Sequence, residues 1–220
     1  MLLLALDTST PAVTAGVAAL DAASGAISVL AERVTINPRA HGELLTPHLT
    51  EAARACDVAL TDLDAVVCGV GPGPFTGLRA GMVTAAALAH GLGIPAYPVC
   101  SLDAIAAEAG TGAPLLVATD ARRREVYWAR YDADGAREVG PAVDPPADVP
   151  VGETRVVGNA GAMVSRAAGE PSFPTGYGLV RVAASAVIAG EEPSPLTPLY
   201  LRRPDAAEPH ERKRVTEVRA

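Results

Sequence analysis

The sequence has almost no lysine. Its basic residues are 17 arginines and a single lysine, Lys213, which lies near the C-terminus. A P-loop NTPase, a Schiff-base enzyme and a protein kinase each need a lysine inside the fold. The sequence therefore excludes these classes of enzyme.

Aromatic residues are also scarce, at 4% of the chain, and the net charge is −7. Few aromatic side chains leave little material for a base-stacking platform. A broad nucleic-acid-binding face would show an excess of basic residues, so we expect none on the isolated chain. Hydrophobic residues make up 49% of the 220 positions, which is enough to bury a core and excludes a disordered chain.

Metal-ligand patterns are missing. The three cysteines Cys56, Cys68 and Cys100 are widely spaced and form neither a C-x-x-C pair nor a zinc pattern. We expect them to be reduced. His41 and His48 are seven residues apart, which separates them by about 10 Å along a helix. Two ligands at that separation cannot chelate one ion, so we predict no metal site.

Long hydrophobic runs are missing too. Asp7 interrupts the apolar N-terminal run, and no charge-free stretch of membrane-spanning length follows. We therefore expect a soluble, cytoplasmic protein with no membrane partner.

The hydrophobic pattern predicts an α/β protein. Strands are expected at residues 2–6, 12–20, 26–34, 65–70, 96–99, 115–119, 125–131 and 156–157, and helices at residues 41–57, 75–91, 101–109, 159–168 and 178–190. A proline-rich connector is expected between the last two strands. The second half looks like a shortened copy of the first, which favours two similar lobes with a cleft between them. The expected divisions are residues 1–105, residues 106–201 and a mobile tail at residues 202–220.

A polar turn follows the first predicted strand. It contains Asp7, Thr8 and Ser9, and Asp120 stands at the corresponding place in the second half. A carboxylate and hydroxyl groups on such a turn can hold a metal–phosphate group. Asp and Thr are also good turn formers, so a purely structural role stays open.

A glycine-rich loop lies between a predicted strand and helix. It reads G-P-G-P-F-T-G-L-R, which is neither a Walker A sequence nor a dinucleotide fingerprint. Backbone N–H groups at a helix start can bind an anion, but two prolines remove donors. A rigid turn that positions the helix is the alternative. The candidate loop residues are Gly71, Gly73, Thr76, Gly77 and Arg79.

The helix at residues 75–91 has small residues at every fourth position, namely Gly77, Gly81, Ala85 and Ala89. Its other faces are apolar or small, so it needs to be buried on all sides. We favour a subunit interface that this helix forms together with the helix at residues 41–57, and burial within its own lobe is the alternative. The candidate interface residues are Leu45, His48, Leu49, Ala52, Leu78, Gly81, Met82 and Ala85.

Five motifs together resemble one known family. L-A-L-D-T-S-T, H-G-E-L-L-T-P-H-L, G-P-G-P-F-T-G-L-R, D-A-R-R-R-E-V-Y-W-A and P-L-Y-L-R-R-P occur in this order over nearly the whole chain. They resemble the TsaB (YeaZ-type) family of tRNA threonylcarbamoyladenosine biosynthesis proteins. Pro74 stands where the family usually has serine, a departure that affects hydrogen bonding in the loop.

The resemblance implies the actin-like ATPase (Hsp70/sugar kinase) fold, with two similar lobes that each hold a mixed sheet flanked by helices. It also implies a non-catalytic scaffold subunit that forms a homodimer in isolation. In the cell this subunit would bind TsaD, the catalytic paralogue, together with the ATPase TsaE, and would meet tRNA only through the complex. No cofactor is required, although weak or interfacial binding of ATP or ADP within the complex is compatible with the family.

Two other functions stay open at this point. One is an active enzyme of the same fold, either a small-molecule kinase or a glycopeptidase-like hydrolase. The basic residues that follow Asp120 disfavour a second phosphate loop. The other is an interaction protein outside tRNA modification.

Overall fold

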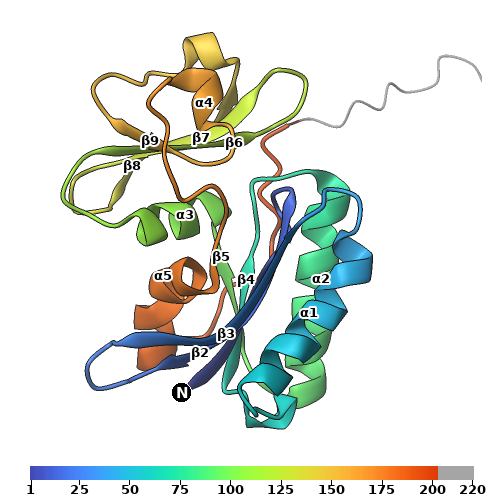
Figure 1. The fold of residues 1–220 in the computed structure, drawn as a ribbon. Helices are drawn as coiled ribbons and strands as arrows, with labels where there is room; N and C mark the ends of the chain where they lie inside the picture. The colour runs from blue at the N-terminus through green and yellow to red at the C-terminus, as the bar shows by residue number, and fades with distance from the viewer. Residues whose placement is uncertain (203–220) are drawn as a thin grey trace, which may run out of the picture.

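The computed structural model describes residues 1–202, and Figure 1 shows an α/β protein with two mixed β-sheets flanked by helices. The first sheet has the strand order β3-β2-β1-β4-β5, in which β1 is antiparallel to β2 and parallel to β4. Its strands are β1 (Leu2–Asp7), β2 (Ala12–Leu20), β3 (Ile27–Ile36), β4 (Ala65–Gly69) and β5 (Ala96–Val99).

The central strand β1 is buried on both faces, which explains its continuous apolar run. Leu4 and Leu6 belong to the core on one side of the sheet, and Leu3 and Ala5 belong to the core on the other side. The first core is covered by α1 (His41–Ala55) and α2 (Phe75–Leu92), which lie side by side in Figure 1. The second core is covered by α5 (Gly176–Ala189).

The second sheet has the order β8-β7-β6-β9. Strand β6 is antiparallel to β7 and parallel to β9. Its strands are β6 (Leu115–Asp120), β7 (Val126–Tyr131), β8 (Arg137–Asp144) and β9 (Arg155–Val157). The order therefore repeats the arrangement β3-β2-β1-β4 of the first sheet.

Helix α3 (Ser101–Ala109) lies between the two sheets (Figure 1). Its Ala104 belongs to the core under α5, whereas its Leu102 and Ile105 belong to the core of the second sheet. One helix with two apolar faces thus joins both parts of the molecule.

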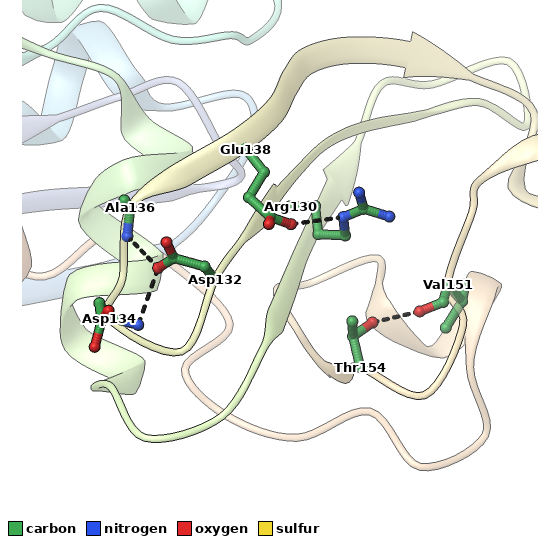
Figure 2. A network of polar contacts seen from close by, with 7 residues as sticks. All are labelled: Arg130, Asp132, Asp134, Ala136, Glu138, Val151 and Thr154. Atoms are coloured by element: carbon green, nitrogen blue, oxygen red, sulfur yellow. Dashed lines mark hydrogen bonds and ion pairs between the residues drawn. The ribbon is translucent and has the colours of Figure 1, made fainter.

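Figure 2 shows how the turn between β7 and β8 is held. The Asp132 carboxylate accepts hydrogen bonds from the backbone N–H groups of Asp134 and Ala136, at 2.9 and 2.8 Å. Arg130 and Glu138 form an ion pair at 3.1 Å between the two strands that flank this turn. The hairpin is therefore fixed at both its tip and its stem.

The sequence-based elements agree with these bounds to within about two residues, with two exceptions. Strand β8 lies in the stretch that was expected to be a connector. It can contain Pro141 because this residue occupies a bulge in an edge strand, where proline is tolerated. The helix expected at residues 159–168 is only α4 (Gly161–Val164). After this helix the chain returns to the sheet, where Gly169 forms a parallel bridge with Val157, the last residue of β9.

Short 3₁₀ helices complete the described structure, at η1 (Leu60–Asp62) and η2 (Pro146–Asp148). Within residues 1–202, no helix is both long enough and apolar enough to cross a membrane.

The chain after α4 returns to the first sheet. Helix α5 packs on that sheet, and further on the Leu199 N–H donates to the Val70 carbonyl at 2.9 Å. The expected division of the chain at residue 105 remains a prediction. The structure shows in addition that the segment after α4 packs on the first sheet. The expected tail at residues 202–220 lies outside the described residues, apart from Arg202.

Candidate functional site

A cavity of about 730 Å³ lies where the β1–β2 turn and the end of β6 come together. The other walls are the loop before α1 and the first turns of α1 and α2. Of the residues singled out in the sequence, Thr8, Thr76, Gly77 and Asp120 line this cavity. The structure thus brings the two polar turns and the glycine-rich loop to one place.

Asp7 and Ser9 belong to the same turn but do not line the cavity. The Asp7 side chain is buried, and its Oδ1 accepts hydrogen bonds from the backbone N–H and the Oγ of Ser9, both at 2.8 Å. Its Oδ2 accepts a hydrogen bond from the Oγ of Ser101 at 2.5 Å. Burial raises the pKa of Asp7 above its ordinary value, although these hydrogen bonds act in the opposite direction. The carboxylate therefore serves the fold and is not presented to a ligand.

Ser101 extends this network into the glycine-rich loop. Its Oγ accepts a hydrogen bond from the Gly71 N–H at 3.2 Å, and its own N–H donates to the Gly71 carbonyl at 2.7 Å. Gly73 packs on the Ser9 backbone so closely that an added Cβ would lie 2.2 Å from the Ser9 carbonyl oxygen. Gly73 is therefore needed to dock the loop on the turn, whereas Gly71 is favoured by its φ of 94°.

Thr8 connects the turn to the middle of α2. Its Oγ1 donates to the Gly77 carbonyl at 2.7 Å and accepts from the Gly81 N–H at 3.0 Å. The hydroxyl is thus inserted between the two partners of an ordinary i to i−4 helical hydrogen bond. A Cβ at Gly81 would lie 2.4 Å from this hydroxyl oxygen. The helix therefore needs a glycine at this position to accommodate the Thr8 hydroxyl.

Arg79 does not point into the cavity. Its guanidinium lies 3.8 Å from the centre of the Phe75 ring, and its Nε donates to the Tyr200 hydroxyl at 2.8 Å. The Phe75 and Tyr200 rings are stacked, with 5.4 Å between their centres. Arg79 thus anchors the segment that follows α5 and does not bind an anion in the loop.

The cavity walls carry a balance of charge that favours an anion. Arg39 and Arg122 line it, together with His41 and a single carboxylate, Asp120. Helix α2 opens on the cavity with no side-chain cap and no acidic residue in its first turn. The exposed N–H groups and the helix dipole add positive potential there.

His41 is fixed in the wall because its Nε2 lies 2.7 Å from the Thr10 carbonyl oxygen. Asp120 is already engaged, since its Oδ1 accepts from the Arg122 N–H at 2.7 Å. Within residues 1–202, no group of three or more His, Cys, Asp and Glu side chains is placed to hold a metal ion.

The eight side chains predicted to form a subunit interface lie instead in the core of the monomer. They cover the first sheet, and the His48 Nε2 is 2.9 Å from the Thr35 Oγ1 of β3. The prediction for these side chains is wrong because the small and apolar positions face the chain's own sheet. The outer face of α2 carries other residues, among them Val83, which is 66% exposed.

The sequence did not indicate that Arg39, His41 and Arg122 line one cavity. They come from segments more than 80 positions apart, and only the packing of the two sheets joins them. The sequence offered only a local indication that these residues could belong to a site, because His41 begins a predicted helix and Arg122 follows the end of a predicted strand.

Comparison with known proteins places this geometry in a family. A family model described as "TsaD: tRNA N6-adenosine threonylcarbamoyltransferase" matches residues 29–175. An uncharacterized protein of Mycobacterium tuberculosis is 54% identical over 206 residues, which are 92% of each chain. The "tRNA threonylcarbamoyladenosine biosynthesis protein TsaB" of Escherichia coli is 39% identical over 126 residues, which are 53% of this chain and 54% of that protein.

A solved structure described as "YeaZ from Pseudomonas aeruginosa" superposes with a TM-score of 0.76 at 30% identity, covering 91% of this chain and 99% of that one. The family model places this α/β protein in the class that includes the threonylcarbamoyltransferases. Within this class, the chain belongs to the TsaB (YeaZ-type) family.

Proposed function

We propose that this protein is a non-catalytic scaffold subunit of the bacterial complex that adds a threonylcarbamoyl group to the adenosine beside the anticodon of ANN-reading tRNAs. Relatives named for tRNA threonylcarbamoyladenosine biosynthesis support the pathway. The observation that carries the non-catalytic role is the inward, hydrogen-bonded carboxylate of Asp7. The fold is proposed to be the actin-like one, with two lobes.

The placement of the two carboxylates argues against phosphoryl transfer in the cavity. Such a reaction depends on cations and a metal ion placed on the phosphates and on a carboxylate that can reach them. Here Asp7 faces inward, and Asp120 is engaged by the backbone of the following turn. We therefore propose that ATP or ADP binds weakly, held by the positive wall, and is not hydrolysed, and that no cofactor is required.

The proposed partner in the cell is TsaD, and TsaE also joins the complex. In isolation, a second copy of this chain takes the place of TsaD. The matching TsaD-family model supports a related surface on the two proteins. We place the contact on the exposed outer faces of α1 and α2. Val83, Ala86 and Ala87 lie on the exposed side of α2 and offer an apolar surface without charge.

Val83→Arg tests this contact. We expect the variant to remain folded, because Val83 is exposed, and to lose both dimer formation and TsaD binding in light scattering and co-purification. Val139→Arg, at an exposed position of the second sheet, is the matched control and should retain both. Gly81→Arg should unfold the monomer, as circular dichroism would show. Retention of TsaD binding by Val83→Arg would place the contact elsewhere.

Threonylcarbamoylation of unmodified tRNA by purified TsaD and TsaE, with and without this chain, tests the function itself. TsaC with threonine, bicarbonate and ATP supplies the threonylcarbamoyl group in both reactions. We expect modification only when the chain is present, and no ATP hydrolysis by the chain alone. Equal modification without it would contradict the scaffold role. Robust ATP hydrolysis by the isolated chain would favour an active enzyme.

A further inference from the structure

The turn between β6 and β7 has an unusual backbone. Arg122, Arg123 and Arg124 have φ angles of 62°, 55° and 63°, so three consecutive residues with side chains lie in the left-handed region. Hydrogen bonds close the turn, from Ala121 N–H to the Glu125 carbonyl and from Glu125 N–H to the Arg122 carbonyl, both at 3.0 Å. The turn thus has a defined, hydrogen-bonded backbone.

Arginine is a poor choice for this backbone. Left-handed residues are usually Gly, Asn or Asp, because a larger side chain crowds its own backbone there. Any of these three would form the same turn at lower cost. The arginines are therefore not explained by the fold, and strained positions of this kind cluster where a protein meets its ligands.

These arginines are exposed, and the surroundings do not neutralise all of them. Elsewhere, Arg33, Arg130 and Arg137 each pair with a carboxylate. Within residues 1–202, Arg122 and Arg124 make no such side-chain ion pair. The turn is consequently a local positive patch on a chain of net charge −7.

We propose that the arginine turn, Arg122–Arg124, binds the phosphodiester backbone of the tRNA that the complex modifies. This inference rests on the proposed function. Guanidinium groups bind phosphate oxygens in a bidentate manner, and such contacts fix the position of an RNA without reading its sequence. Only Arg122 lines the cavity, so a ligand that engages the whole turn extends outside it, as a polynucleotide does and a nucleotide does not.

The test is a titration of unmodified tRNA against the assembled complex over a range of salt concentrations. Each phosphate contact contributes close to one unit to the slope of log affinity against log salt. For Arg122→Gln/Arg124→Gln we expect weaker binding and a slope smaller by about one to two units. The matched control Arg166→Gln/Arg181→Gln changes the charge equally at exposed positions outside the turn and should behave as wild type.

Three results would overturn the proposal. One is an unchanged affinity and slope, and another is a loss equal to that of the control. The third is a loss of assembly with TsaD in size-exclusion chromatography, which would show that the arginines bind the protein partner. An ADP titration of the same variant shows whether the arginines bind the phosphates of a nucleotide or those of tRNA. A lower ADP affinity with unchanged tRNA binding would show that the turn binds a nucleotide. A tRNA that is modified without this chain would instead contradict the proposed function.

A second variant separates charge from backbone. Arg122→Gly/Arg124→Gly fits the left-handed backbone better and should melt at the same or a higher temperature, while it loses as much tRNA affinity as the glutamine variant. A lower melting temperature with unchanged tRNA affinity would show that the arginines serve the fold, and the proposal would fail.

Discussion

The β1–β2 turn and the β6–β7 turn occupy corresponding positions in two sheets that share the order of four strands, yet the two turns differ in burial, charge and backbone conformation. The first turn is buried. Its residues Asp7, Thr8 and Ser9 form hydrogen bonds with one another, with Ser101 and with α2. The second turn is exposed, charged and held in a left-handed backbone.

The difference follows from the helix that covers each turn. In the first sheet, β4 leads into α2, which has 18 residues and accepts the Thr8 hydroxyl into its hydrogen-bond ladder. In the second sheet, β9 leads into α4, which has only four residues. A turn beside so short a helix needs fewer buried polar partners, and the side chains at residues 122–124 lie at the surface.

The largest expected effect comes from Asp7→Ala. It would leave three buried donors unpaired, namely the Ser9 N–H, the Ser9 hydroxyl and the Ser101 hydroxyl. Each unsatisfied buried group costs about 1–3 kcal/mol, so we expect the free energy of unfolding to fall by about 3 kcal/mol or more. Urea denaturation followed by circular dichroism measures it.

Asp120→Ala is the matched change in the second turn. It removes one hydrogen bond to the Arg122 N–H, for which we expect a loss of about 1 kcal/mol. Equal losses for the two variants would show that the turns are not as different as the structure indicates.

The fold was largely predictable from the sequence because its signals are local. The apolar run of β1 and the turn residues after it fix a buried strand, and the glycine-ended pattern of α2 fixes a helix. Strand β8 was missed because proline is read as a breaker, whereas an edge strand with a bulge accommodates Pro141.

The candidate site was predictable only in part. Its polar turns could be recognised, but their orientation could not, since the hydrogen bonds of Asp7 depend on Ser101, which is 94 positions away. The small residues of α2 were assigned to a partner because a sequence does not show whether a smooth helix face meets another chain or the chain's own turn. The Thr8 hydroxyl at Gly81 answers that question.

Substitutions of two glycines in α2 test the buried contact of the β1–β2 turn, and we expect them to change the free energy of unfolding by intermediate amounts. For Gly81→Ala we expect a loss of about 2 kcal/mol, because the new methyl group would overlap the Thr8 hydroxyl and displace the turn. Gly91→Ala in the same helix meets open space and should stabilise the protein by up to about 1 kcal/mol. Thermal denaturation of both variants distinguishes the buried contact from helix propensity, and a gain for Gly81→Ala would contradict the tight docking.

The buried turn should also make stability depend on pH, through the titration of Asp7. Burial raises the pKa of this carboxyl above its ordinary value of 3.8, so the folded protein binds the proton more tightly than the unfolded chain does. Its contribution to stability is therefore greatest below the ordinary pKa and decreases as the pH rises toward the raised value, by at most about 1.4 kcal/mol per pH unit. Urea midpoints measured upward from pH 4 should fall in the wild type and fall less in Asp7→Asn. Thr8→Val disturbs the same turn without a titrating group and should keep the wild-type slope. A wild-type midpoint that rises over this range and flattens in Asp7→Asn would show that the hydrogen bonds from Ser9 and Ser101 outweigh burial.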